Sequence, residues 1–207
     1  MYENTKLFEM TIPEKDETVK DQILAAAMQV FKKWGLHKTT MEDIAKAAGK
    51  GKSTLYYYYK SKEDIFDEAA RHELDQVFKQ CTETIANISS AKEKLRLYIS
   101  TVFLEIKKRA DFYSIVAQET REDRKIVTRL VGYYHKIEEK IIGDIVKFGV
   151  SSKEFAFANK NDQARAVFVI VLILRNLQIE LGINQVADDL TPYINMTSQI
   201  LINGIRA

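Results

Sequence analysis

Cysteine, proline and histidine are rare in this chain: its 207 residues include one cysteine, two prolines and three histidines. A single cysteine, Cys81, excludes an intramolecular disulfide and is typical of a reducing compartment, so we expect the protein to be cytoplasmic. The histidines and the cysteine are scattered, with neither metal-ligand spacing nor a catalytic set among them. We therefore expect no enzyme activity, no bound metal and no cofactor.

Long apolar runs are also missing. The most apolar stretch, AVFVIVLIL at residues 166–174, has nine residues, whereas an α-helix needs about 20 to cross a bilayer. Acidic residues are scattered through residues 1–15, which lack the apolar core of a signal peptide, so we expect a flexible N-terminal arm. A chain with 46% hydrophobic and 29% charged residues is expected to be globular and soluble, without a membrane partner.

The most informative segment covers residues 39–63, with the sequence TTMEDIAKAAGKGKSTLYYYYKSKE. Thr40 can cap a first short helix, with Asp43 as the reciprocal acid of a capping box. Ala45 is small where a second helix must cross closely, and Gly49 can adopt the positive φ of a sharp turn. Leu55 can then fill the space between the two helices. A small residue, a glycine and an apolar residue at this spacing indicate a helix-turn-helix.

The same segment lies in the basic part of the chain. From Lys32 to Lys62 there are eight lysines and two acids, a formal charge of +6, while the whole chain carries +2. A basic segment on a nearly neutral chain indicates a localised polyanion-binding surface. Hydroxyl groups, which hold phosphate oxygens, are interleaved with these lysines and include the four tyrosines Tyr56–Tyr59. The combination favours major-groove DNA binding over an ordinary solvated lysine-rich face.

A phosphate-binding loop is the alternative suggested by Gly51-Lys52-Ser53. That motif needs a glycine five residues before Gly51, where this chain has Lys46. The residues upstream are helical in pattern rather than strand-like. We therefore do not expect nucleotide hydrolysis.

A wider set of residues extends this pattern: Asp21–Ala27, Phe31, Gly35, Thr39, Thr40, Ile44, Ala45, Ala48, Gly49, Thr54–Tyr57 and Lys60–Glu63. The set covers about a quarter of the chain and resembles the TetR (tetracycline-repressor-like) family of bacterial transcription regulators. The resemblance implies a sequence-specific DNA-binding regulator that represses transcription, binds a palindromic operator as a homodimer and is released by a small, largely apolar effector.

The resemblance also assigns the DNA contacts. It implies phosphate contacts for Thr40, Tyr57 and Lys62, and groove contacts for Lys52, Ser53, Thr54 and Tyr56. Thr39 adds a further hydroxyl to the expected interface. Lys50 stands where the family usually has a valine in the turn, so it is expected either to point outward and contact DNA or to loosen the turn.

We expect an all-α fold of about nine helices in three parts. These are a flexible arm (residues 1–15), a three-helix DNA-binding domain with the helix-turn-helix (16–62) and a helical ligand-binding and dimerisation domain (63–207). The first helix should end at Gly35, and Ser61 should cap the fourth. Further helices are expected around residues 95–106, 112–118 and 122–148, followed by the apolar segment and a last helix from Leu190 to about Gly204.

Residues 166–174 are apolar on every side of a helix, and every side must therefore be covered. By resemblance, the last two helices would pair with their copies in a dimer, which would place two reading helices roughly 34–36 Å apart on a palindrome. The expected interface residues are Phe168, Val169, Leu172, Ile173, Tyr193, Ile200 and Leu201. The alternative is a helix buried entirely within a monomer.

Aromatic residues are frequent in the middle helices. By resemblance they would enclose a pocket for the effector, which typically is apolar with a few polar anchors. The expected lining is Tyr98, Val102, Phe112, Tyr113, Tyr133, Tyr134, Ile137 and Arg175. The alternative is that these side chains form ordinary core. Arg175, if buried, needs an acidic ligand or an acid such as Glu138 or Glu180.

A helical protein-interaction module without DNA binding is the other functional class that fits this sequence. The two classes differ in the salt dependence of DNA affinity, which is steep when phosphates are contacted. The expected partners are an operator duplex, a second copy of the chain and a small effector. The sequence leaves open the operator, the effector, the regulated genes, the direction of regulation and any DNA contact of the arm.

Overall fold

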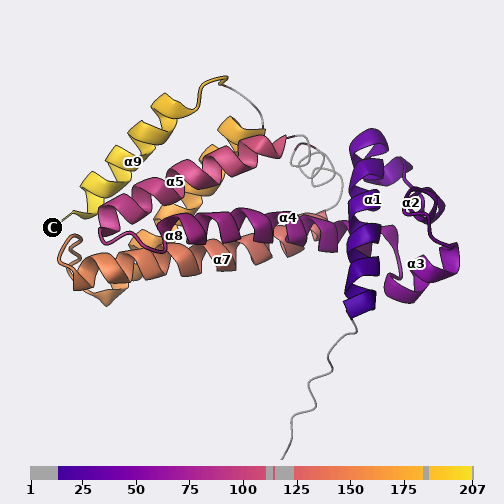
Figure 1. Cartoon of the computed structure of the whole chain (residues 1–207). Helices are drawn as coiled ribbons and strands as arrows, with labels where there is room; N and C mark the ends of the chain where they lie inside the picture. The colour runs from indigo at the N-terminus through magenta and orange to yellow at the C-terminus, as the bar shows by residue number, and fades with distance from the viewer. Residues whose placement is uncertain (1–13, 111–113, 115–123, 184–186, 207) are drawn as a thin grey trace, which may run out of the picture. The chain divides into compact units, whose positions relative to one another are not determined.

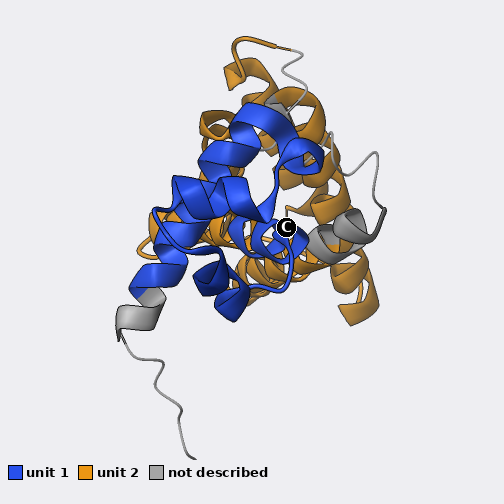
Figure 2. Ribbon diagram, turned by 90° about the vertical axis from the view of Figure 1, so that its right-hand side faces the viewer, with its two compact units in different colours: residues 1–69 blue, residues 70–207 orange. Residues whose placement is uncertain are grey.

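The computed structural model describes residues 14–110, 114, 124–183 and 187–206. These residues are helical or lie in short connections, without a β-strand among them, so the all-α expectation is confirmed. They form two compact units, residues 1–69 and 70–207 (Figure 2). Residues 1–13 of the expected arm and most of the expected helix at 112–118 lie outside the described residues, whereas residues 14 and 15 already belong to the first helix, Glu14–Lys38. Within the described part, no helix is long and apolar enough to span a membrane.

Unit 1 consists of α1 (Glu14–Lys38), α2 (Met41–Ala47), α3 (Lys52–Tyr58) and the beginning of α4 (Lys62–Ile85). Helix α1 packs against α2, and α2 against α3. The side chains with no exposed surface are Ile23, Ala27, Phe31, Ile44, Leu55, Ile65 and Phe66. Among them the rings of Phe31 and Phe66 meet edge to face, with centroids 5.4 Å apart.

Local chemistry sets the breaks between these helices. The helical conformation of α1 is interrupted at Gly35, where φ is +75°, a value that a side chain would make costly. Thr40 caps α2: its hydroxyl accepts from the Asp43 N–H at 3.2 Å, and the Asp43 carboxylate accepts from the Thr40 N–H at 2.9 Å. Gly49 has φ +62° in the turn before α3. The predicted capping box and turn are therefore confirmed, and α1 is interrupted at the Gly35 where its end was predicted, although helical residues continue to Lys38.

Unit 2 contains the rest of α4, α5 (Ala91–Lys108), α7 (Arg124–Ser151), α8 (Lys160–Leu177), the π-helical segment η1 (Gln178–Ile183) and α9 (Thr191–Ile205). Helix α5 packs against α7 and α9, and α7 packs against α8 (Figure 1). Helix α8 is longer than the expected apolar core of residues 166–174, because Asn159 caps it seven residues earlier.

A carboxylate that follows α7 caps the N-terminus of α5. Glu154 accepts hydrogen bonds from the Ser90 hydroxyl at 2.7 Å, the Ala91 N–H at 2.8 Å and the Lys92 N–H at 3.2 Å. Burial alone would raise the pKa of Glu154, but these hydrogen bonds lower it to about 2. A negative charge at a helix N-terminus is stabilising, so Glu154 fixes the α7–α8 connection to α5.

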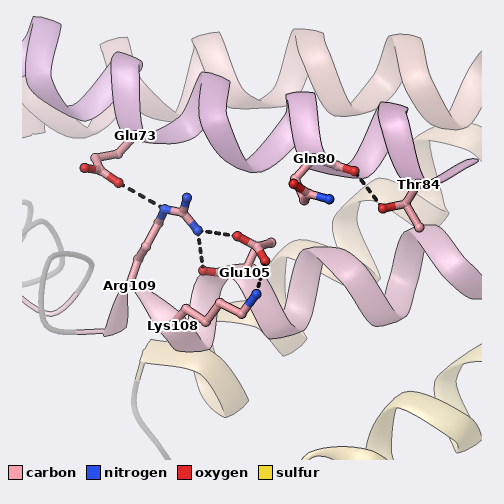
Figure 3. A network of polar contacts seen from close by, with 6 residues as sticks. All are labelled: Glu73, Gln80, Thr84, Glu105, Lys108 and Arg109. Atoms are coloured by element: carbon pink, nitrogen blue, oxygen red, sulfur yellow. Dashed lines mark hydrogen bonds and ion pairs between the residues drawn. The ribbon is translucent and has the colours of Figure 1, made fainter.

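Arg109, which follows α5, joins that helix to α4 (Figure 3). Its Nε donates to Glu73 of α4 at 3.0 Å, and its Nη1 donates to the carboxylate of Glu105. Glu105 is buried, and Lys108 also donates to it. A buried carboxylate is stable only when it is paired in this way. The network therefore holds the part of α4 that belongs to unit 2 against α5.

Candidate functional site

Helix α3 turns one side into unit 1 and the other side to solvent. Leu55 is fully buried between α2 and α3, as its spacing predicted, whereas the next residue, Tyr56, is exposed and Tyr57 is 78% exposed. The Tyr57 ring rests edge to face on Tyr58, with centroids 4.9 Å apart. Exposed aromatic hydroxyls on a short helix of a basic module offer hydrogen-bonding groups to a polyanion.

Most of the expected DNA contacts share this accessible surface. Thr40, Lys52 and Ser53 are exposed, and Lys50 and Thr54 are half-buried. The Lys52 ammonium lies 3.7 Å from the Glu42 carboxylate, and both side chains are well exposed. An exposed ion pair of this kind is worth little free energy, so Lys52 can exchange it for a phosphate or a base edge.

Thr39 is the first correction to the expected interface. Its side chain is 1% exposed, and its hydroxyl donates to the Gly35 carbonyl at 2.6 Å. The hydroxyl therefore satisfies a backbone oxygen at the break in α1, and it has no surface left for a phosphate. The hydroxyl that was expected to contact DNA is structural.

Lys62 has a structural role that the sequence did not indicate. Its ammonium donates to three carbonyl oxygens at the end of α1 and in the connection after it: Leu36 at 2.8 Å, His37 at 3.0 Å and Thr39 at 2.9 Å. An ammonium has three N–H donors, and all three are occupied here. Lys62 therefore joins the start of α4 to the end of α1 in this structure, and the phosphate contact that the resemblance implied stays a prediction.

Two apolar stripes lie on the surface of unit 2. They consist of Phe168, Val169 and Ile173 on α8, and Tyr193, Met196 and Ile200 on α9. Leu172 lies beside the first stripe and is half-buried. Leu201 was expected in the same surface, but it is 7% exposed and faces the core of its own unit, whereas Ile200 is 62% exposed. Met196 was missed because α9 is apolar on both of its sides.

The expected effector-binding residues divide into three groups. Tyr98, Val102 and Tyr134 are buried in unit 2, and Ile137 and Arg175 are half-buried. Tyr133 is a correction: its hydroxyl donates to the exposed Asp75 at 2.6 Å and the Arg71 guanidinium lies over its ring, so it lies between α4 and α7 outside the buried interior. Phe112 and Tyr113 lie outside the described residues.

Glu138 and Gln178 were not among the expected site residues, yet they form the polar centre of this interior. Glu138 has no exposed surface, and burial raises its pKa to about 7, although hydrogen bonds from Gln178 and Tyr98 and the positive charge of Arg175 lower it. Its position four residues after Tyr134, on the apolar side of α7, was the available signal. Cys81, also buried, has its pKa raised to about 12 by burial, so the thiol fills space as expected.

The comparisons with known proteins agree with this arrangement. Residues 23–69 match the family model described as "Bacterial regulatory proteins, tetR family". The fatty acid metabolism regulator protein of Bacillus subtilis (strain 168) is 30% identical over 133 residues, which is 64% of this chain and 69% of that protein. The transcriptional repressor KstR2 of Mycolicibacterium smegmatis is 29% identical over 144 residues, 69% of this chain and 70% of that protein.

Solved structures extend the similarity over both units. The structure of the regulator FadR from Bacillus subtilis in complex with stearoyl-CoA is 27% identical, with a TM-score of 0.68 over 90% of this chain and 99% of that chain. FadR from Bacillus halodurans is 23% identical with a TM-score of 0.72 over the same shares, and it shows the common fold. The relatives are regulators rather than enzymes. This chain therefore belongs to the tetR family of bacterial regulatory proteins and is a DNA-binding regulator of transcription.

Proposed function

We propose that this protein is a cytoplasmic repressor that binds a palindromic operator as a homodimer and leaves it when a small, largely apolar effector binds to unit 2. The observation that carries the proposal is the exposed face of α3 in a segment with a formal charge of +6. That face supplies side chains for base edges and phosphates, and the turn at Gly49 presents it as a helix-turn-helix requires.

Two groups of side chains are assigned different contacts with DNA. We assign the reading of base edges to Lys52, Ser53, Thr54 and Tyr56, which lie on or beside the exposed face of α3. Thr40, Lys50 and Tyr57 are assigned to phosphates, which fix the register of the module without reading sequence. Thr39 and Lys62 are left out of both groups, because their polar atoms are already bound within unit 1.

The dimer is proposed from the two apolar stripes on α8 and α9. Exposed apolar side chains scattered singly are normal, but stripes on two helices indicate an interaction surface. A second copy is the partner that also explains a palindromic operator, because a two-fold dimer carries two reading helices.

The effector is proposed to act through α4, which begins in unit 1 and continues into unit 2. Arg109 holds its unit 2 part against α5. A ligand weakens DNA binding only if it prefers a state of the dimer in which the two reading helices no longer fit adjacent grooves. Because a relative was crystallised with stearoyl-CoA, a long-chain acyl thioester is the first effector to test.

We expect Lys52→Ala and Thr54→Ala to reduce affinity for the preferred operator about tenfold or more, since a base contact is worth about 1–3 kcal/mol. Affinity for a random duplex should change little. Fluorescence anisotropy on duplexes selected from the source genome, repeated between low and high salt, measures both quantities. Lys140→Ala, an exposed lysine of α7, is the control, and stearoyl-CoA should release the wild-type complex. Affinity that does not depend on salt would support the protein-interaction class instead.

A second experiment tests the dimer. Val169→Asp is expected to give monomers, because it places a charge in a stripe that the proposal buries. Size-exclusion chromatography with light scattering measures the mass at a concentration where the wild type is a dimer. Leu104→Asp on α5 is the matched control, because Leu104 is 48% exposed and Val169 is 49% exposed. A dimeric Val169→Asp protein, or two variants that behave alike, would contradict the assigned surface.

A further inference from the structure

Four polar side chains meet inside unit 2: Tyr98 on α5, Tyr134 and Glu138 on α7, and Gln178 at the start of η1. The Tyr98 hydroxyl donates to Glu138 Oε1 at 3.1 Å, and the Gln178 amide nitrogen donates to the same oxygen at 3.2 Å. The Tyr134 hydroxyl donates to the Gln178 amide oxygen. The two donors on one oxygen fix the orientation of the Glu138 carboxyl group.

The other carboxyl oxygen, Glu138 Oε2, has no hydrogen-bond partner among the described residues, although it is buried. A buried acceptor without a partner is costly and rare in a folded protein. Arg175 lowers the pKa of Glu138 by its charge, but no ion pair within 4.0 Å joins them in the described part. When Glu138 is ionised, Oε2 is therefore an acceptor in the described interior of unit 2 that has no donor.

Local backbone geometry supports a functional reading of this position. Helix α8 continues directly into a π-helical segment at Gln178, and π-helical turns occur frequently at functional sites. Gln178, the first residue of that segment, is buried, and its amide lies between Tyr134 and Glu138. The wider turn thus coincides with the side chain that orients the carboxyl group.

We propose that Glu138 Oε2 is the polar anchor of the effector site and accepts a hydrogen bond from a hydroxyl group on an otherwise apolar effector. This inference rests on the proposed ligand response and adds the chemical class of the ligand. A neutral hydroxyl fits better than an ammonium, because the charge of Arg175 already acts on this position. A plain hydrocarbon chain placed here would leave the oxygen unpaired.

The test compares two probes with the same number of carbon and oxygen atoms, 1-octanol and methyl heptyl ether, by isothermal titration calorimetry on the full-length protein. Both can accept a hydrogen bond, but only the alcohol donates one. At a pH of about 8.5, where Glu138 is ionised because its pKa is about 7, we expect the wild type to bind the alcohol about tenfold more tightly, because an unpaired charged acceptor is strongly penalised. Equal binding of the two probes, or binding of neither, would contradict the proposal that Glu138 Oε2 binds the effector. A buried water that donates to Oε2 would then be the better explanation.

Glu138→Gln adds a second arm with a specific expectation. Tyr98 and Gln178 both donate toward the Oε1 position, so the amide oxygen should occupy it and the amide NH₂ should replace Oε2. This group donates to either probe, and the preference for the alcohol should fall to within about twofold. Glu139→Gln, at an exposed neighbour on the same helix, should keep it. A preference that persists in Glu138→Gln would place the hydroxyl elsewhere.

These titrations need no DNA, so their outcome is separate from that of the proposed function. If the alcohol preference is found but the operator is not bound, the proposed repressor fails and the anchor stands. If the operator is bound and released by stearoyl-CoA but the wild type does not discriminate between the probes, the repressor stands and the anchor is overturned.

Discussion

Replacing Gly149 with alanine is expected to lower the free energy of unfolding by about 3 kcal/mol, at the upper end of the usual cost of overpacking a core. Gly149 lies in the last turns of α7, and a Cβ atom there would stand 2.1 Å from Cδ2 of the Phe155 ring. Phe155 is buried and its N–H donates to the Gly149 carbonyl at 3.0 Å. Because Phe155 is buried, its ring has little space into which it could turn away from the added carbon. Urea denaturation followed by circular dichroism measures the change.

The same helix supplies the control. Gly143 also lies inside α7, and a Cβ atom there would meet no atom within 4 Å. Gly143→Ala is therefore expected to stabilise the protein by about 0.5–1 kcal/mol, because alanine loses less backbone freedom in a helix than glycine. Opposite signs for the two alanines are the expected result. If both variants were destabilised by similar amounts, the cause would be a general sensitivity of helix α7 to substitution. That result would contradict the specific clash with Phe155.

The parts of the fold that could be predicted from the sequence depend on neighbours a few residues apart. The capping box of Thr40 and Asp43 spans three positions, and the positive φ of Gly49 follows from its place in a tight turn. Leu55 is buried because its spacing from Ala45 fits the crossing of two short helices. Each of these features is determined by local geometry, so the residue pattern was sufficient.

The features that the sequence did not reveal depend on distant contacts. Lys62 binds carbonyl oxygens 23 to 26 positions away, and a lysine on a basic surface gives no sign of such a partner. Leu201 and Ile200 are adjacent apolar residues, and the pattern cannot tell which faces the core when a helix is apolar on both sides. The spacing of Glu138 from Tyr134 placed it on the apolar side of α7, but its hydrogen bonds with Tyr98 and Gln178, each 40 positions away, follow only from the packing of α5 and η1.

The polar interior of unit 2 also limits what the resemblance could supply. The resemblance implied that the aromatic residues form an apolar lining, and Tyr98 and Tyr134 are indeed buried. Both of them, however, use their hydroxyls to orient Glu138 and Gln178. A family resemblance carries the position of a ligand-binding domain, but the acceptor left open at Glu138 belongs to this chain's own side chains.

Replacing Lys62 with methionine is expected to lower the free energy of unfolding by about 2 kcal/mol and to weaken binding to specific and random duplexes alike. The substitution keeps the apolar stem but removes three charge-assisted hydrogen bonds to the carbonyls of Leu36, His37 and Thr39. Those bonds hold the end of α1 to the start of α4, so the loss loosens the module that presents α3. Urea denaturation and anisotropy titrations measure the two effects.

The salt dependence of DNA affinity distinguishes two roles of Lys62: holding α1 to α4, or making the phosphate contact that the family resemblance implied. A lysine that neutralises one phosphate contributes about 0.9 to the slope of log affinity against log salt. If Lys62 only holds α1 to α4, it contributes nothing to that slope. Lys62→Met should then keep the wild-type slope while the stability of the protein falls. Lys60→Met is the matched control, because Lys60 is an exposed lysine two positions earlier and should leave stability unchanged. If Lys62→Met instead flattens the slope by about one unit at full stability, its ammonium leaves the three carbonyls when DNA binds.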